Sequence, residues 1–598
     1  MAFYLSPLVD VNEIDLTTTV PAVATSIACC VLRRTFKGPE KKRTLVTNID
    51  ELTTMFGYPT DNSYKDMLSA TGYLKYGNKL WCTRTMPVDA KFAGCFGPAT
   101  SASTLTGYGT SAYQLNDFSS EDPDVIQDES LFSTAPLSAD SDNAITFIAS
   151  SRGAWGNKIK VAVIDGTTYS AVTSAAAGNP STEYSSTNVN LELYRDIVDL
   201  DYPVESAREF IVLVRAADQD DFNKATIPYT LKEVFYVSSD ENKLDDEGDN
   251  IYCENVINTK SKYIRIAVDP ANFKNSDITI NTGQYYAMTG GTDSSFADDD
   301  AEDTAGIAAF ELYEDPDVID VNIFIDSDSN VTVKREIIDI CETRKDAMAV
   351  LDVLKADVVN NDGNEVTDLR DYRLSTLNEN TSYASLYGNW LDVFDTWNSK
   401  YRWIPASGHM AGIYARTDDL ADPWFAPAGL NRSILTNIRK LAFNPTLGER
   451  DILYKNGINP IAAFAGQGKV VWGQKTMLDK SSAFNRINVR RLFMVMEKAI
   501  STASKYFLFE PNDEFTRLSI INMVEPFLRD VRGRRGIYDF MVVCDERNNT
   551  AERIDRQELW VDIYIKPVRA AEFIVLNFVA TKTGASFTEL VAQTTSGL

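Results

Sequence analysis

The stretch VIDVNIFIDSDSNVTVKREIIDICETRKDAMAVLDV, residues 318–353, decides the fold class. It opens with an apolar run over residues 318–325 that predicts a buried strand. Residues 333–343 follow with an apolar stripe at helical spacing, and a second apolar run over residues 347–353 predicts another buried strand. Strand, helix and strand at this spacing favour a parallel β-α-β unit, so we expect an α/β core.

A second block of similar character lies near the N-terminus. Its pattern predicts a strand, two helices and a strand, at residues 24–32, 48–57, 65–76 and 80–83. Asn48, with Glu51 three residues later, gives the first helix a capping-box-like start, and Gly57 marks its end. We therefore expect residues 21–86 to form a compact unit of two strands and two helices.

Residues 87–300 differ in kind from the blocks on either side. Ser, Thr, Asp and Gly dominate residues 97–146, and the short apolar runs that follow predict strands joined by long loops. The expected strands cover residues 144–148, 159–164, 189–194, 210–214, 234–237 and 263–268. With 34 acidic and 14 basic residues, this β-rich insert has a net charge of −20, which indicates a solvated face.

An aromatic-rich segment at residues 383–401 carries apolar side chains near helical spacing. The stripe consists of Leu386, Trp390, Leu391, Phe394 and Trp397. A stripe of this kind belongs to a protein core more often than to a ligand site. We therefore expect residues 383–401 to form a buried helix.

The region from residue 481 onwards is close to electrically neutral, with 16 basic and 15 acidic residues. Its apolar pattern predicts two helices, at residues 492–505 and 513–529. The expected strands cover residues 537–544, 559–565 and 573–579. This region therefore contrasts with the acidic insert in both charge and predicted structure.

The first twenty residues contain too few apolar groups to form a core of their own. Val9, Val11, Ile14 and Leu16 are apolar positions among acidic and polar neighbours, and Pro21 ends the run. A string of this kind usually adds as a strand to another sheet. We therefore expect residues 1–20 to form an arm.

The residues that most enzymes need are scarce in this chain. His409 is the only histidine, and its small, apolar neighbours favour a buried or loop position over a nucleophile site. No glycine loop of the GxxxxGKS/T type occurs, so no nucleotide phosphate site is predicted. Residues 326–330 imitate the start of an EF-hand but lack its glycine and its bidentate glutamate, so we interpret them as a turn. We expect no catalytic residue, no cofactor and no metal.

The charge balance argues against a nucleic-acid surface. The chain has 85 acidic and 58 basic residues, so it should repel phosphate and anionic lipid. Residues 21–32 form an apolar run of about a dozen residues, short of the ~20 that span a bilayer, and no secretion signal is evident. Seven cysteines without a CxxC pair indicate reduced, mostly buried thiols. We expect no direct contact with nucleic acid, no stable membrane insertion, and assembly in a cytoplasm.

Two clusters of arginine stand out in the near-neutral region. They comprise Arg486, Arg490 and Arg491, followed by Arg532, Arg534 and Arg535. A nucleic-acid site would need more positive charge around them. We interpret them as structural or intersubunit ion pairs, in which the planar guanidinium matches a carboxylate.

An ordered series of short motifs runs through the C-terminal half. Its residues include Arg402, Trp403, Pro405, Arg416, Asp418, Trp424, Pro427, Gly429, Arg432, Trp472, Arg490 and Arg491. The N-terminal half adds Phe56-Gly57-Tyr58-Pro59 and the stretch RGAWGN at residues 152–157. The series resembles the tail-sheath proteins of contractile-tailed phages, particularly the large T-even type. The resemblance covers residues 1–90 and 300–598 and is weak through the insert.

The resemblance implies a multidomain α/β and α+β architecture. A discontinuous inner core would combine residues 21–86 with residues 301–480. The insert, residues 87–300, would form one or more outer domains, and residues 481–598 an inner domain that faces a tube. The terminal arms would exchange strands between subunits, through Val9, Val11, Ile14 and Leu16 at one end and Phe573, Val575 and Phe578 at the other.

The same resemblance implies a structural and not an enzymatic function. Such subunits form hexameric rings that stack into a helical polymer around a tail tube, and the polymer contracts to drive the tube through a host envelope. The implied partners are other copies of the chain, the tube protein, and baseplate and tail terminator proteins. The implied location is the virion, after assembly in a bacterial cytoplasm. Arg529, Arg532, Arg534 and Arg535 are our candidates for contact with an acidic tube.

Two alternatives remain open at this point. The chain could serve the same mechanism in a phage-tail-like bacteriocin or a contractile injection system. More remotely, the acidic insert could be a working domain that binds or hydrolyses carbohydrate. A hydrolase of that kind needs a pair of carboxylates, and nothing in the sequence singles out two among the many present.

Overall fold

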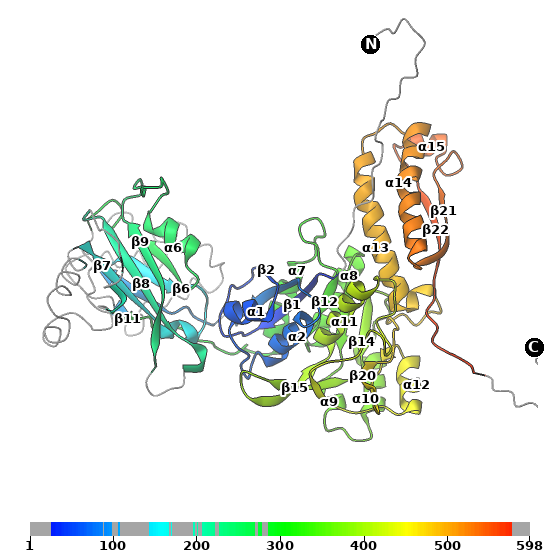
Figure 1. Cartoon of the computed structure of the whole chain (residues 1–598), viewed down its shortest axis with the longest axis horizontal. Coiled ribbons are helices and arrows are strands. Elements are labelled where there is room, and N and C mark those ends of the chain that lie inside the picture. Colours follow the sequence, from blue (N-terminus) through cyan, green and yellow to red (C-terminus); the bar gives the residue numbers. More distant parts are fainter. Residues whose placement is uncertain are drawn as a thin grey trace, which may run out of the picture.

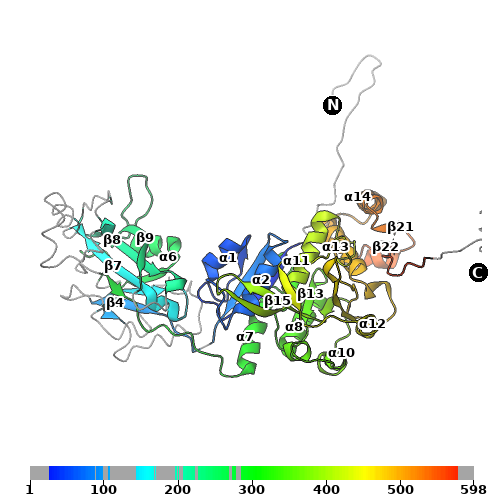
Figure 2. The same ribbon diagram turned by 60° about the horizontal axis from the view of Figure 1, so that its bottom comes forward.

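The computed structural model describes residues 26–87, 89–98, 106–107, 143–166, 169, 195–197, 200, 206–221, 227–268, 273–277 and 285–576. Figure 1 shows three parts in a row: the β-rich insert, a central α/β part, and a helical hairpin with a two-stranded sheet towards the C-terminus. The view in Figure 2 shows the insert and the hairpin on opposite sides of the central part. The mixed α and β character agrees with the expected fold class.

A seven-stranded sheet holds the central part together. Its strands, in spatial order, are β18 (Ile458–Asn459), β14 (Ala384–Tyr387), β13 (Met348–Asp352), β12 (Ile323–Ile325), β1 (Ala28–Arg33), β3 (Leu80–Thr85) and β2 (Thr44–Val46). Neighbours pair in parallel except β2, which runs antiparallel to β3. Strands from before and after the insert therefore share one sheet, with Ala28 opposite Ile323 at the seam.

The predicted β-α-β unit at residues 318–353 is confirmed. It consists of β12, helix α8 (Val331–Arg344) and β13, which pairs in parallel with β12. The first strand is shorter than predicted, because the chain reaches the sheet only at Ile323 and leaves Val318 61% exposed. Residues 326–330 form the connection to α8, as predicted, and their Asp326 is held by a buried ion pair with Lys334 at 3.2 Å.

Helices cover both faces of the central sheet. One face packs against α1 (Ile49–Phe56), α2 (Tyr64–Leu74) and α11 (Ser407–Leu420), and the other against α7 (Asp299–Glu311) and α8. In β1, Cys30 and Leu32 point into the first layer, whereas Cys29 and Val31 point into the second. A strand buried on both faces needs apolar residues at every position, which explains the unbroken apolar run in the sequence.

The buried helix predicted at residues 383–401 is wrong. The segment contains β14 and then β15 (Trp390–Asp395), which forms a second sheet with β16 (Lys400–Pro405) and β17 (Ile438–Leu441). Asn389 interrupts any helix, because its side-chain oxygen accepts the N–H of Trp390 at 2.9 Å. Ser399, at φ 51°, closes the turn into β16.

The rest of the central part consists of short elements. They are α9 (Lys355–Val358), α10 (Glu365–Asp371), a π-helical turn (Tyr372–Leu377), α12 (Leu447–Lys455), β19 (Ile461–Phe464) and β20 (Gly468–Val471). The last two strands pair antiparallel as a separate hairpin. These elements surround the edge of the central sheet at β18 and lead the chain towards the C-terminal hairpin (Figure 1).

Helices α2 and α11 approach each other closely because glycine lines their contact. A Cβ atom on Gly408 would lie 2.1 Å from the backbone oxygen of Ser69, so no larger residue fits there. His409 fills the same contact and is fully buried, which confirms the expected buried position. Burial, aided by the positive charge of Lys75, lowers the pKa of His409 to about 3, so the imidazole stays neutral at ordinary pH.

The insert consists of two four-stranded sheets that share one apolar core. The first sheet contains β10 (Ile264–Val268), β6 (Asn143–Ala149), β4 (Gly94–Pro98) and β5 (Thr106–Gly107), and the second contains β11 (Tyr286–Ala287), β7 (Ile159–Asp165), β8 (Glu209–Ala217) and β9 (Tyr229–Ser238). Helix α6 (Cys253–Lys260) packs on this core. The predicted β-rich character is confirmed, although the strand expected at residues 189–194 lies outside the described residues.

The insert joins the central part through a paired neck. The chain that enters the insert and the chain that leaves it form β-bridges, with Lys91 opposite Thr292 and Gly94 opposite Thr289. The backbone N–H of Gly94 donates to the oxygen of Thr289 at 2.9 Å, and that of Thr289 donates back to Gly94 at 3.1 Å. The two ends of the insert therefore lie side by side.

Buried charges fix the insert against the central part. Glu40 accepts from Arg84 of the central sheet at 3.0 Å, and it also pairs with Arg152 of the insert. All three side chains are buried, and burial lowers the pKa of Arg84 to about 10. Gln219 of the insert adds a reciprocal pair of hydrogen bonds to the backbone of Tyr58. This joint links the two parts, because loss of any one of the three side chains would leave a buried charge without its partner.

The C-terminal part contains two long helices and a small sheet. They are α13 (Ile487–Ser504), α14 (Glu514–Gly533), β21 (Ile537–Val543), α15 (Ala551–Asp555) and β22 (Asp562–Pro567). The two helices and the first two strands predicted after residue 481 are confirmed. The strand predicted at residues 573–579 is absent from its described portion, residues 573–576, which has no regular structure.

Several features are missing from the parts of the chain that the structure describes. None of the helices there has the length and apolar character needed to cross a membrane. No three or more His, Cys, Asp or Glu side chains in those parts come together as a metal site. All seven cysteines are buried, as the sequence predicts.

We expect Gly408→Ala to lower the free energy of unfolding by about 2–3 kcal/mol, because the added methyl group would force α2 and α11 apart. Gly448→Ala in α12 is the matched control, since nothing lies within 4 Å of its missing Cβ. Urea unfolding followed by circular dichroism would measure both variants. Equal losses in the two would show that the glycine contact does not limit the approach of the helices.

Candidate assembly surface

The C-terminal hairpin is built on two antiparallel helices joined by a short connection. Asp513 is the N-cap of helix α14, and its carboxylate accepts the N–H of Thr516 at 2.8 Å. Leu492 of α13 and Val524 of α14 belong to one buried cluster that holds the helices together. Figure 1 shows the hairpin standing out from the central part, with β21 and β22 along one side of it.

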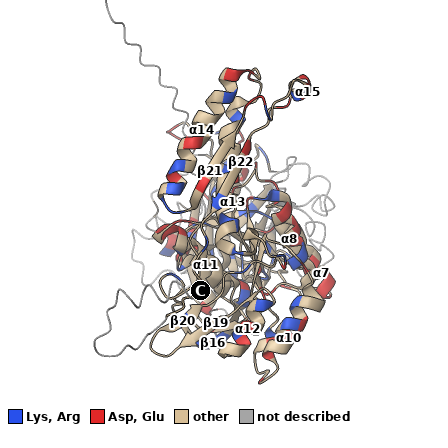
Figure 3. Cartoon of the chain, turned by 90° about the vertical axis from the view of Figure 1, so that its right-hand side faces the viewer, with Lys and Arg blue, Asp and Glu red and all other residues tan. Residues whose placement is uncertain are grey.

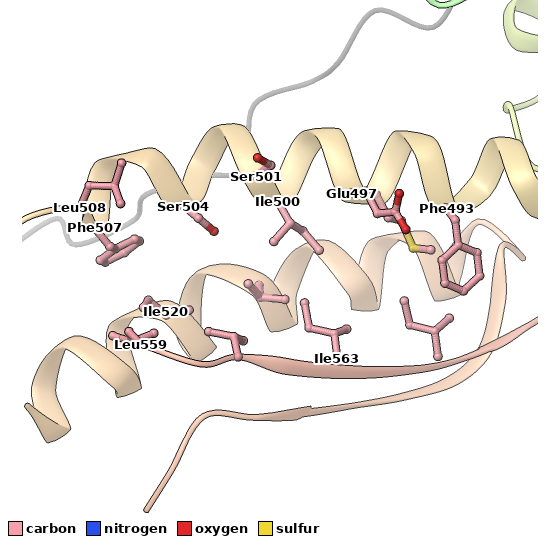
Figure 4. A pocket seen from close by; sticks show the side chains of 14 residues that line it. Phe493, Glu497, Ile500, Ser501, Ser504, Phe507, Leu508, Ile520, Leu559 and Ile563 are labelled. Atoms are coloured by element: carbon pink, nitrogen blue, oxygen red, sulfur yellow. The ribbon is translucent and has the colours of Figure 1, made fainter. Parts of the chain in front are cut away.

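An apolar groove lies between α13, α14 and β22 (Figure 4). We call it the hairpin groove, and its volume is about 540 Å³. Its lining comprises Phe493, Met496, Glu497, Ile500, Ser501, Ser504, Phe507, Leu508, Ile520, Val524, Leu559, Val561, Ile563 and Ile565. Only Glu497 and two serines are polar, so the hairpin groove suits an apolar segment better than a charged ligand.

The sheet beside the groove has two strands in the described chain, β21 and β22. Phe540, Val542 and Ile565 face the helices, whereas Tyr538 and Tyr564 are exposed at 67% and 57%. A two-stranded ribbon leaves backbone N–H and C=O groups unpaired along its edges. An extended segment of another chain can therefore add to it as a strand.

Large apolar side chains are exposed where α13 passes into α14. We call this set the apolar tip: Tyr506, Leu508, Phe509, Phe515 and Leu518. Phe509 has a positive φ of 71° and a fully exposed ring. Leu508 belongs both to the apolar tip and to the lining of the hairpin groove, so the two surfaces are continuous. Contiguous apolar surface of this kind usually marks a protein contact.

The described part of the predicted arms agrees with an exposed terminal segment. Phe573 and Val575 are 87% and 80% exposed, and residues 573–576 have no regular structure. Phe578 and the four N-terminal positions Val9, Val11, Ile14 and Leu16 lie outside the described residues. The strand exchange expected of both arms stays a prediction.

The candidate tube-contacting arginines lie at the end of α14, where basic and acidic residues are interspersed (Figure 3). Arg529 pairs with Glu525 at 2.6 Å and Arg532 approaches Asp539 at 3.8 Å. Arg534 pairs with both Asp422 and Asp530 at 2.8 Å. Arg535 follows the helix at φ 67°. Much of the predicted positive patch is therefore compensated within the subunit, although all four pairs are partly exposed.

Several residues of the motif series join the central part internally. Arg402 bonds to Asp61 at 2.6 Å and to Asp395 at 2.9 Å, and its guanidinium stacks on Tyr64. The other residues of this group are Trp403, whose ring lies under Lys440, Pro405 at the end of β16, and Arg416, which stacks on Tyr76. These contacts are structural.

Four of the remaining motif residues, Asp418, Trp424, Arg490 and Arg491, connect the central part to the hairpin. Asp418 of α11 forms a buried ion pair with Arg491 of α13 at 2.7 Å. The indole N–H of Trp424 donates to the oxygen of Arg534 at 3.1 Å. Arg490 of α13 lies between Tyr383 and Phe484. These four residues fix the base of the hairpin on the central part. The others lie within the central part: Pro427 is buried, Gly429 has a φ of 87°, Arg432 stacks on Phe425, and Trp472 packs on Phe464.

The sequence signal for the hairpin groove was present but incomplete. Leu559, Val561, Ile563 and Ile565 recur at every second position, which predicts a strand with one aliphatic face. Ile500 and Ser504 lie four residues apart on the matching face of α13. What the sequence does not show is that these two faces meet and leave a space between them, because that depends on how the hairpin folds back.

Comparison with known protein families finds matches for the second part of the central region and for the C-terminal hairpin. Residues 313–477 match the phage tail sheath protein central domain, and residues 479–581 match the phage tail sheath C-terminal domain. The tail sheath protein of Vibrio phage KVP40 is 29% identical, over 98% of this chain and 99% of that protein. That of Enterobacteria phage T4 is 37% identical, over 51% of this chain and 48% of that protein.

A solved structure shares the fold. The sheath tail protein Lin1278 from Listeria innocua has a TM-score of 0.52 and 12% identity, over 92% of this chain and 93% of that one. The two sheath-domain matches and the similarity to the tail sheath proteins of KVP40 and T4 show that the chain is a structural protein of a contractile tail and not an enzyme. It belongs to the phage tail sheath family.

We expect Ser504→Trp to reduce the binding of an apolar dye such as ANS roughly twofold, because the indole would fill part of the hairpin groove. Thr502→Trp is the matched control, since Thr502 is exposed on the same helix and does not line the groove. Dye fluorescence at matched protein concentration would measure both. An equal reduction in the two variants would mean that the dye binds elsewhere.

Proposed function

We propose that this chain polymerises as stacked hexameric rings around a tail tube and contracts to drive the tube through a host envelope for genome delivery. The observation that carries the proposal is the open apolar surface of the C-terminal hairpin. The hairpin groove, the two-stranded ribbon and the apolar tip lie together. Contact with another copy of the chain would bury the apolar surface of the groove and the tip and would pair the free edge of the ribbon. The tail sheath relatives supply the context in which such cover would occur.

Each of the three parts would have its own place in the assembly. Residues 21–86 and 301–480 would form the inner core, which the shared seven-stranded sheet supports. Residues 87–300 would face outwards, where acidic and loop-rich surface is tolerated. Residues 481–598 would lie against the tube, and baseplate and terminator proteins would meet the ends of the polymer.

The terminal arms would connect neighbouring subunits. An apolar string such as Val9, Val11, Ile14 and Leu16 has the composition of a strand that could add to the open ribbon of another subunit and cover its groove. The exposed segment at Phe573 would serve in the same way at the other end. Each subunit would then be tied to its neighbours while its own core stays intact.

Contraction would be an exchange between two packings of one folded subunit. The buried ion triad links the core to the insert, because Glu40 pairs with Arg84 of the central sheet and with Arg152 of the insert. This link supports motion of the core and the insert as one body. The contracted packing would have to be favoured by about 3 kcal/mol or more for the conversion to be nearly complete. No nucleotide would be consumed, because the free energy would be stored when the extended polymer assembles.

Deletion of residues 1–19 should leave a folded subunit that does not form tubular polymers. Too few apolar groups lie in this segment to support the core, so the unfolding midpoint should stay within about 2 °C of the full chain. Negative-stain microscopy and sedimentation of the purified protein would measure polymer formation. Normal tubes from the deleted chain would reject the arm as a tether.

Reversal of Arg532 and Arg534 to Glu should abolish assembly on tail tubes and spare polymers formed without tubes. The reversed charges would repel an acidic tube face. Arg547→Glu is the matched control, because Arg547 is an exposed arginine of the same hairpin in a pair with Asp545. Microscopy of subunits mixed with purified tubes would score decoration. Tubes that are decorated normally by the double variant would exclude this contact.

A further inference from the structure

Glu572 is held by three side chains at the point where the chain leaves the subunit. Arg486 donates to both carboxylate oxygens, from Nε at 2.6 Å and from Nη2 at 2.9 Å. The hydroxyl of Tyr454 donates at 3.0 Å and the amide of Gln474 at 3.2 Å. A carboxylate with this many directed donors is fixed in orientation as well as in position. We call this arrangement the Glu572 clamp.

The clamp joins regions that are far apart in the sequence. Tyr454 belongs to α12, Gln474 follows β20, and Arg486 immediately precedes α13. Glu572 itself comes five residues after β22 ends. The clamp therefore ties the last described segment to the base of the hairpin and to the central part at the same time.

The segment before the clamp is fixed at both of its ends. The backbone N–H of Val568 donates to the oxygen of Gly536 at 3.1 Å, which holds the start of the segment on the hairpin. Glu572 holds the other end. From Phe573 to Leu576 the side chains are 71–87% exposed, so the clamp marks the boundary between the body of the subunit and its exposed terminal segment.

The electrostatics favour the ionised form of Glu572. Burial alone would raise the pKa of the carboxyl, but the hydrogen bonds and positive charge of Arg486 outweigh that effect and leave the pKa below its usual value. The partners respond in the opposite sense: burial and the neighbouring Glu572 charge raise the pKa of Tyr454. The Glu572 clamp is therefore closed at neutral pH and weakens only as the pH falls through the lowered pKa.

We propose that Glu572 is a positioning residue that fixes where, and in which direction, the C-terminal arm leaves the subunit. With the clamp closed, Phe573 is the first residue free to contact another copy of the chain. With the clamp open, the free segment would begin as far back as Arg569, and its start would no longer be aligned with the body. The use of the arm by another copy rests on the proposed function, whereas the clamp itself does not.

A direct test of the clamp uses the isolated subunit. Trypsin can cut after the exposed Arg569, which lies between the two fixed points, only if the segment detaches locally. Glu572→Gln should raise the rate of that cut about tenfold, and Arg486→Met should do the same. If the two residues act through one clamp, the double variant should be cut no faster than either single variant. Mass spectrometry of the released fragment identifies the bond.

The control and the second readout separate the clamp from the proposed assembly. Arg370→Met breaks an exposed pair with Asp371 at 2.9 Å and should change neither measurement. Glu572→Gln should also shorten tubular polymers several-fold in micrographs at a subunit concentration where the unaltered chain forms long ones. An unchanged cutting rate would overturn the clamp, and faster cutting with polymers of normal length would overturn its positioning role. Failure of the unaltered chain to polymerise would count against the proposed function instead, while trypsin still reports on the clamp.

Discussion

The structure depends on one parallel contact, the pairing of β1 with β12. The two strands are almost three hundred residues apart in the chain, yet Ala28, Cys29 and Cys30 lie opposite Ile323, Phe324 and Ile325. Neither piece of the central part can close its apolar layers without this seam, because each strand is buried on both faces. The insert is therefore a side branch between two strands of one sheet, and the hairpin attaches to the core that this sheet forms.

The sequence predicted elements well where local pattern and final environment agree. Helix α13 and the β-α-β unit have unambiguous periodicity, and Asn48 caps α1 through Glu51 as the spacing indicates. It failed at residues 383–401, where buried strands and a tight turn happen to repeat apolar residues near helical spacing. Only the tertiary pairing with β13 and β16 distinguishes the two, and that pairing is not a local property.

The arginine clusters show the same limit for the candidate site: the local sequence predicts the kind of interaction, and the tertiary fold decides the partner. The sequence indicates ion pairs for Arg486, Arg490 and Arg491, but it cannot name the partners, since Glu572 and Asp418 lie many residues away on other elements. Among the described residues Arg490 forms no ion pair with a carboxylate; it lies between two aromatic rings and bonds to Ser382. The hairpin groove could likewise not be predicted from the sequence, because it exists only where two separately predictable apolar faces meet.

The paired neck of the insert has a consequence for how such chains diversify. Because Lys91 and Thr292 are bridged, the entry and exit of the insert are separated by no more than the spacing of adjacent strands, about 5 Å. A domain of almost any size whose termini are neighbours can be exchanged at such a junction without lengthening or straining the central sheet. The insert can thus vary in size and sequence while the strand pairing of the central sheet stays unchanged.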